Sequence, residues 1–189
     1  LKGMSMKLEE HAQILPGVLT SRIVEDEAGM RYKLYDNHDF YKDVFAHVPV
    51  KVTPKYVNVA EKSAKVIVKH GNVVINLTLQ RAAMVHNDNA TFLTFNYARV
   101  ELNDEIDPRY FVYWFNRSKE AQNQIYRAVQ SGTQTKKISI SSIRAMHITF
   151  PSIEEQRIIG KLFEAKAKMK LLKQQRYDLE MKYLSATLF

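Results

Sequence analysis

The chain has 189 residues, 46% of them apolar and 11% aromatic, which is enough to bury a core and argues against global disorder. It carries a formal charge of +8 and no cysteine, which excludes disulfides and thiolate metal sites and fits a reducing cytoplasm. No apolar run reaches the roughly 18 residues of a membrane span, so we expect no contact with a membrane.

The excess positive charge is concentrated in two segments. Residues 51–85 contain six Lys or Arg against one acid, and residues 117–147 again contain six against one. Residues 86–107 are acidic by contrast, with five acids and one Arg. This distribution predicts a surface that binds a polyanion, most commonly nucleic acid, although a protein that simply has a high pI is the alternative.

From Met4 to Phe150 the pattern predicts a mixed α/β domain with largely antiparallel strands. A short helix is expected at 7–14, and β-rich runs follow it. The runs cover residues 18–24, 31–35, 65–68, 73–79, 83–85, 92–102 and 145–150. Side chains alternate throughout 91–102 with apolar residues on both faces, which predicts one central strand there.

One helix is predicted between the last strands. Asp107 is a good N-cap residue, and Pro108 occupies the first helical position, where its missing N–H costs nothing. Apolar residues then recur at spacings of three and four up to Val129, and Ser131-Gly132 provides an end for the helix.

A second, much longer helix is predicted after Pro151, from about residue 153 to residue 186. Ser152 and Glu155 have the spacing of a capping box. The residues that follow form an unbroken heptad seam: Ile158, Leu162, Ala165, Met169, Leu172, Arg176, Leu179, Tyr183 and Ala186. A seam with a 3.5-residue period favours a partner helix over packing against the chain's own domain, which is the alternative. We therefore predict a homodimer formed through this helix.

Catalytic motifs are lacking. Asp107-Pro108-Arg109-Tyr110 differs from the D-P-P-Y element of amino-methyltransferases, and Glu164-Ala165-Lys166 has nuclease-like spacing but lies within the long helix. No glycine-rich cofactor loop follows a strand, and the six histidines form no metal-binding pair. We expect a protein that is not an enzyme and uses no metal or cofactor.

Two polar clusters are candidates for contact with DNA. Hydroxyls, amides and cations of these types bind phosphates or base edges, with Arg suited to guanine and Gln to adenine. A solvated loop is the alternative for each cluster. The candidates are Thr78, Gln80, Arg81, Thr133, Gln134, Thr135, Lys136 and Lys137.

Residues 131–189 resemble the specificity subunits of Type I restriction–modification systems. The resemblance rests on Gly132-Thr133 before Ile138-Ser139, on Ile148 through Pro151, and on Glu155-Gln156 with Ile159-Gly160 before a long helix. Residues 4–130 match only loosely, through Leu15-Pro16-Gly17 and the helix that begins at Pro108.

The resemblance implies a division of the chain into a DNA target recognition domain, 4–151, and a spacer helix, 152–189. It further implies that the target recognition domain reads half of a bipartite double-stranded DNA target. The helix would pack antiparallel on a second one and dock adenine methyltransferase subunits and, through them, restriction subunits. Complete members carry two domains and two helices, so one of each suggests a half-subunit or a truncated gene product.

Two other functions stay open from the sequence. One is a coiled-coil adaptor whose basic surface contacts an acidic protein, and salt-dependent binding to duplex DNA would distinguish it. The other is a stand-alone DNA-binding regulator, although no helix-turn-helix pattern is present.

Overall fold

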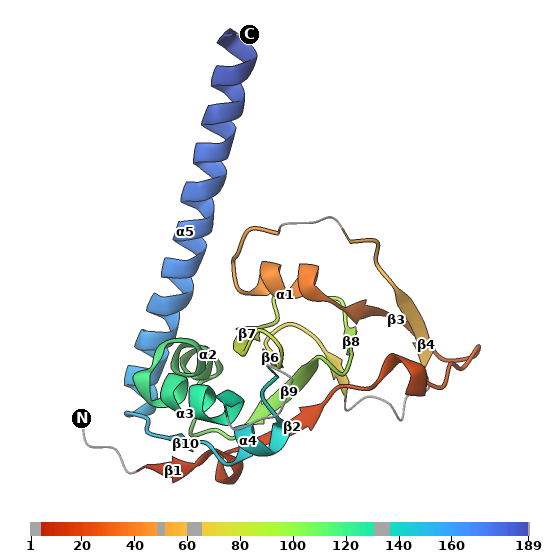
Figure 1. Ribbon diagram of the computed structural model, residues 1–189, viewed down its shortest axis with the longest axis vertical. Helices are drawn as coiled ribbons and strands as arrows, with labels where there is room; N and C mark the ends of the chain where they lie inside the picture. Colours follow the sequence, from red (N-terminus) through yellow and green to blue (C-terminus); the bar gives the residue numbers. More distant parts are fainter. Residues whose placement is uncertain (1–4, 49–51, 60–65, 131–136, 189) are drawn as a thin grey trace.

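The long helix α5 (Ile153–Leu188) projects away from a head that is built on two four-stranded sheets (Figure 1). This computed structural model describes residues 5–48, 52–59, 66–130 and 137–188. The predicted fold class, a mixed and largely antiparallel α/β domain followed by one long C-terminal helix, is confirmed.

The first sheet is antiparallel throughout and has the strand order β2-β9-β6-β7. Its strands are β2 (Ala12–Pro16), β6 (Val73–Asn76), β7 (Arg81–Met84) and β9 (Tyr97–Leu102). Successive residues of β6 point to opposite faces, so Val73 and Ile75 join the core beneath the helices while Val74 joins a second core. The sheet is therefore covered on both faces, which explains why β6 is buried along its whole length.

The second sheet has the order β4-β3-β8-β5 and contains one parallel pair, β3 with β8. Its strands are β3 (Met30–Tyr35), β4 (Tyr56–Val59), β5 (Ile67–Val68) and β8 (Thr91–Leu93). Helix α1 (Asn37–Asp43) follows β3 and places Phe40 in the core between the sheets. Asp36 caps α1 through a complete capping box with Asp39.

Three helices cover the other face of the first sheet: α2 (Pro108–Arg117), α3 (Lys119–Gln130) and α4 (Ile140–Arg144). The N-cap prediction is confirmed, because Asp107 Oδ1 accepts hydrogen bonds from the backbone N–H of Arg109 and Tyr110. The prediction of one continuous helix is wrong. Ser118 has an extended backbone and accepts a hydrogen bond from the N–H of Ala121, so it ends α2 and caps α3.

The prediction of one strand over 92–102 is also wrong, since a turn at residues 94–96 divides it into β8 and β9 in different sheets. The segment after β2 crosses this turn closely: the N–H of Gly17 bonds to Tyr97 O and that of Val18 to Leu93 O. A side chain at Gly17 would meet the carbonyl oxygen of Thr94 at 2.2 Å, so the crossing requires glycine.

The N-terminal predictions need correction as well. Residues 7–14 do not form a helix but contain the 3₁₀ turn η1 (Leu8–Glu10) and most of β2, which pairs with β9. Pairing with the sheet overrides the helix preference of this stretch. Residues 18–24 form one isolated bridge and the 3₁₀ turn η2 (Thr20–Arg22) instead of a strand. A short ribbon joins β1 (Met6–Lys7) to β10 (His147–Ile148), just before α5.

Candidate nucleic-acid interface

The turn that joins β6 to β7 is held in a defined shape by a buried asparagine. Asn76 Oδ1 accepts hydrogen bonds from the N–H of Thr78 at 3.1 Å and of Leu79 at 2.9 Å. Gln80 closes the turn with φ of 54°, a left-handed conformation that is uncommon for a residue with a side chain. The turn thus presents Thr78 to solvent from a fixed backbone.

Lys137, from one of the clusters predicted from the sequence, lies beside the turn that carries the other. The N–H of Leu77 bonds to Asn96 O, and the N–H of Ile138 bonds to Leu77 O. Lys137 Nζ donates to Asn96 Oδ1 at 2.6 Å and lies 4.2 Å from the ring centre of the exposed Phe95. The turns at 77–80 and 94–96 and the segment that starts at 137 therefore form one surface. The predicted residues Thr133, Gln134, Thr135 and Lys136 lie outside the described residues.

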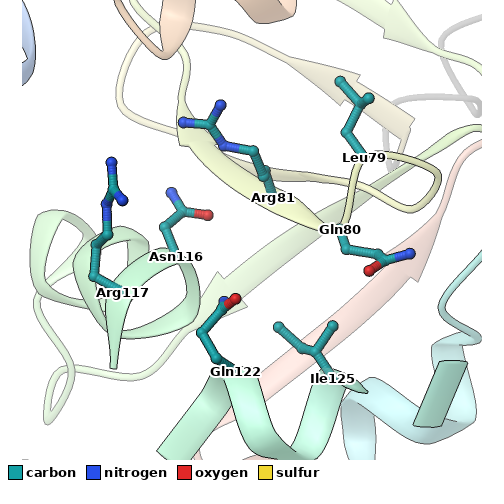
Figure 2. Close-up of a pocket in the computed structure, with 7 residues that line it drawn as sticks. All are labelled: Leu79, Gln80, Arg81, Asn116, Arg117, Gln122 and Ile125. Atoms are coloured by element: carbon teal, nitrogen blue, oxygen red, sulfur yellow. The ribbon is translucent and has the colours of Figure 1, made fainter. Parts of the chain in front are cut away.

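A shallow pocket of about 340 Å³ lies between the β6–β7 turn and helices α2 and α3. Figure 2 shows the guanidinium groups of Arg81 and Arg117 on one side of it and the amide of Gln80 turned away from them. The lining residues are Leu79, Gln80, Arg81, Asn116, Arg117, Gln122 and Ile125.

The two arginines of this pocket place two positive charges close together. Within the described ranges, neither Arg81 nor Arg117 has an acid within 4 Å. Burial lowers the pKa of Arg81, and the nearby charge of Arg117 lowers it further. An oxyanion bound between the two guanidiniums would relieve this repulsion, and the planar guanidinium can bind the oxygens of a phosphate in a bidentate geometry.

The sequence missed three parts of this surface. Phe95 and Asn96 fall inside the single strand predicted there, so the sequence pattern does not indicate that they are exposed in a turn. Arg117 lies within the single helix predicted there, where a basic residue is ordinarily a solvated side chain, and only the packing of α2 on β7 places it beside Arg81. Arg81, Gln80 and Thr78, all predicted, lie on one connected stretch of surface.

The heptad seam of α5 is exposed along its length. Its six large apolar residues have 48 to 71% of their surface accessible: Ile158, Leu162, Met169, Leu172, Leu179 and Tyr183. The opposite face of the first turns packs on α2 instead, through Gln156, Gly160 and Phe163. The chain's own domain thus covers only this face of α5 at its first turns. The seam on the other face remains exposed.

The base of α5 is anchored by polar contacts. The capping box is confirmed, since the N–H of Ser152 bonds to Glu155 Oε2 and the N–H of Glu155 to Ser152 Oγ. The buried Gln156 accepts from the N–H of Asp107 and donates to the carbonyls of Glu105 and Pro151. The first turn of α5 therefore belongs to the packing of the head.

The described residues contain neither a metal site nor a membrane-spanning helix. In the part of the chain that the structure describes, no group of three or more His, Asp or Glu side chains is arranged to hold a metal ion. None of the described helices is long and apolar enough to cross a membrane.

Comparison with known proteins provides a family match. The family model for the Type I restriction modification DNA specificity domain matches residues 24–181. No curated protein matches the sequence.

Several solved structures share the fold. One, from work on complex assembly and conformational transition of the type I R–M system, has a TM-score of 0.61 at 16% identity and covers 98% of this chain. The HsdS subunit from Thermoanaerobacter tengcongensis has a TM-score of 0.57 at 15% identity and covers 92%. The Type I system S subunit from M. genitalium has a TM-score of 0.54 at 16% identity and covers 98%. The chain spans 43, 39 and 44% of their respective lengths.

Proposed function

The chain belongs to the family of Type I restriction–modification DNA specificity domains, and we propose that it recognises one half of a bipartite DNA target without being a catalyst. The observation that carries the proposal is the connected basic surface on which Arg81, Arg117 and Lys137 lie beside the rigid turn at 77–80. Cations of this kind hold phosphates, while a turn with a fixed backbone offers polar side chains to base edges.

Within this surface we assign different roles to different residues. Lys137, Arg81 and Arg117 are positioned to bind the DNA backbone, whereas Thr78 and Gln80 are candidates for base contacts. The alternative for Arg81 is a bidentate contact with guanine. Thr133, Gln134, Thr135 and Lys136 complete the proposed interface from the segment that precedes Lys137.

We also propose a division of labour along the chain. Residues 4–151 form the target recognition domain, and residues 152–189 form a spacer that packs antiparallel against a second copy. Exposure of the seam on α5 supports this, because an apolar stripe of that length needs a partner in water. The same helix would dock the adenine methyltransferase subunits, and through them the restriction subunits.

Selection of bound duplexes from a random pool, with the methyltransferase partner present, tests the proposal. Two identical heads related by a twofold axis can read only an inverted repeat with a fixed gap. Recovery of one continuous asymmetric site would contradict it. The purified chain alone should neither methylate nor cut DNA, even with S-adenosylmethionine, Mg²⁺ and ATP, and turnover by partner-free protein would show a missed active site.

A further inference from the structure

A polar junction connects α5 to the head at Glu164, one helical turn beyond the close contact of Gly160 with α2. Glu164 Oε2 accepts a hydrogen bond from Arg109 Nε on α2 at 2.6 Å. Glu164 Oε1 lies 2.9 Å from His86 Nε2, on the segment that follows β7. One carboxylate of the long helix thus binds two elements of the head, with a different oxygen for each.

The junction continues from His86 to Asp43 on helix α1. The backbone N–H of His86 donates to Asp43 Oδ1 at 2.9 Å, and His86 Nδ1 lies 3.6 Å from the same oxygen. Asp43 ends α1 and is buried, and its other oxygen accepts from the hydroxyl of Tyr35 at 2.6 Å. A chain of polar contacts therefore runs from Arg109 on α2 through Glu164 on α5 and His86 to Asp43 on α1.

The charges in this chain stabilise one another. Asp43 raises the pKa of His86 most, burial opposes this, and Glu164 raises it further. Burial alone would raise the pKa of Glu164, but the hydrogen bonds from His86 and Arg109 outweigh it and hold that pKa below its ordinary value. The ring centre of His70, which is itself 3.8 Å from the exposed Asp88, lies 6.2 Å from that of His86, with the two rings nearly perpendicular.

The position of Glu164 relative to Gly160 gives the junction a mechanical role. A Cβ on Gly160 would lie 2.6 Å from the Cβ of Arg109, so α5 touches α2 most closely there and Glu164 is one turn further along. Gly160 and Phe163 both contact α2, whereas Glu164 also binds His86 on a different element and so resists rotation of α5 about its contact with α2. Tyr183 lies roughly 35 Å beyond Gly160 at 1.5 Å per residue. A pivot of about 10° at Gly160 would therefore move this end of α5 by about 6 Å, more than the 3.4 Å rise of one base pair.

We propose that Glu164 is a positioning residue that fixes the angle between the head and α5 and thereby sets the gap between the two DNA half-sites. The effect on the gap rests on the proposed function, whereas the fixed angle between the head and α5 rests on the junction alone. Glu164 would not contact DNA, and its effect would pass through Arg109 and His86.

Distance measurements between spin labels test the angle without DNA. The chain has no cysteine, so labels at Gln13→Cys on β2 and Gln174→Cys on α5 report the head-to-helix distance in an excess of unlabelled protein. Glu164→Gln keeps the size and removes the charge, and we expect a broadened or displaced distance distribution. Glu180→Gln is the matched control, since Glu180 also pairs with an arginine, but this arginine is Arg176 of the same helix and lies far from the head. Unchanged distances in Glu164→Gln, or equal broadening in the control, would overturn the proposal.

DNA binding by the full chain with its methyltransferase partner tests the consequence. The ratio of affinities for the selected gap and for a gap one base pair longer should fall about tenfold in Glu164→Gln, while affinity for a single half-site stays the same. His86→Gln should also lower this gap ratio. In the double variant the ratio should fall no further than in either single variant, because the two residues act as a unit. An unchanged gap ratio together with broadened distances would refute the link to spacing. A wild type without any gap preference would instead refute the proposed function, and the distances would still decide the role of Glu164.

Discussion

Asn116 on α2 exchanges two hydrogen bonds with the backbone of Ala82 on β7. Its Oδ1 accepts from the N–H of Ala82 at 2.8 Å, and its Nδ2 donates to the carbonyl oxygen of Ala82 at 2.8 Å. Since β7 is the edge of the first sheet, this side chain satisfies backbone groups that a further strand would otherwise bind. It also fixes the neighbouring Arg81 and Arg117 relative to each other.

The first prediction concerns this contact. Asn116→Ala should lower the free energy of unfolding by about 2–4 kcal/mol, because two backbone groups of a buried residue lose their partners. Urea denaturation measures the change. Asn123→Ala, at an exposed position of α3, is the control and should change stability by no more than about 0.5 kcal/mol. A loss of similar size in both variants would show that the pair with Ala82 has no special role.

The second prediction concerns the closest approach of α5 to the head. In an exposed helix, replacing glycine by alanine stabilises by about 1 kcal/mol. Gly160→Ala should instead destabilise by about 1–3 kcal/mol, because the new methyl group would meet Arg109 Cβ at 2.6 Å and the backbone nitrogen of Tyr110 at 2.7 Å. The melting temperature reports the sign, and stabilisation would show that α5 does not pack on α2 at this distance.

The third prediction separates residues that bind the DNA backbone from those that read bases. Arg117→Ala and Lys137→Ala should weaken binding to all duplexes alike, and each should lower the salt slope of binding by about one. Gln80→Ala should instead relax preference at one position by about 1–3 kcal/mol. For Arg81→Ala, the first pattern indicates a phosphate contact and the second a guanine contact.

Binding isotherms across a range of salt concentrations, on specific and unrelated duplexes, decide these assignments. Lys182→Ala is the control, because Lys182 lies near the far end of α5, away from the proposed interface. A salt slope that stays the same in Lys137→Ala and Arg117→Ala would contradict the phosphate assignment, even if affinity falls.

The fourth prediction is a pH window for the contribution of the Glu164 junction to stability. The pKa of His86 is raised, so its contribution is complete below the ordinary value near 6.5 and is lost as pH rises through the raised value. The pKa of Glu164 is lowered, so its contribution is present above the ordinary value near 4.5 and is lost as pH falls through the lowered value. Both are present together between about pH 5 and 6.5.

The difference in stability between wild type and His86→Gln should therefore be largest in that window and should shrink at alkaline pH. Urea denaturation at several pH values measures it. His147→Gln is the control, since His147 is exposed at the short β1–β10 ribbon. A difference that does not change with pH would show that the charge of His86 does not contribute.

The sequence predicts the long helix well because its signals are local. The capping box at Ser152 and the heptad spacing of the seam need no knowledge of the rest of the fold, and the structure contains both the box and the helix. The Asp107 cap is predictable for the same reason. The resemblance also rests on this part of the chain, and the family match confirms it.

The arrangement of the head is less predictable because distant segments decide it. Alternation continues from Thr91 to Leu102 although the chain turns at residues 94–96, where no glycine or proline marks a break. The turn is instead imposed by the segment at Gly17, which crosses it closely. The neighbours Arg81 and Arg117, and the junction of Glu164 with His86, likewise arise only when separate elements pack together.

The exposed seam of α5 is flanked by unbalanced positive charge. Residues 165–177 contain Lys166, Lys168, Lys170, Lys173 and Arg176 and no acid. Antiparallel helices from two copies that overlap in this segment would bring like charges together, which costs free energy that salt reduces. Apolar burial along the seam must exceed this repulsion for a dimer to form.

The fifth prediction is therefore a dimer that strengthens as salt is raised, in contrast to DNA binding, which salt weakens. Leu172→Asp should weaken dimerisation at least a hundredfold, because burial of one leucine contributes about 1.5–3 kcal/mol and a symmetric dimer loses two. Sedimentation equilibrium at micromolar concentrations measures both effects. Gln174→Ala, on the face of α5 away from the seam, keeps the charge of this segment, so it is the control and should leave the association constant unchanged. If wild type and Leu172→Asp are equally monomeric, the seam is not a contact between copies of this chain.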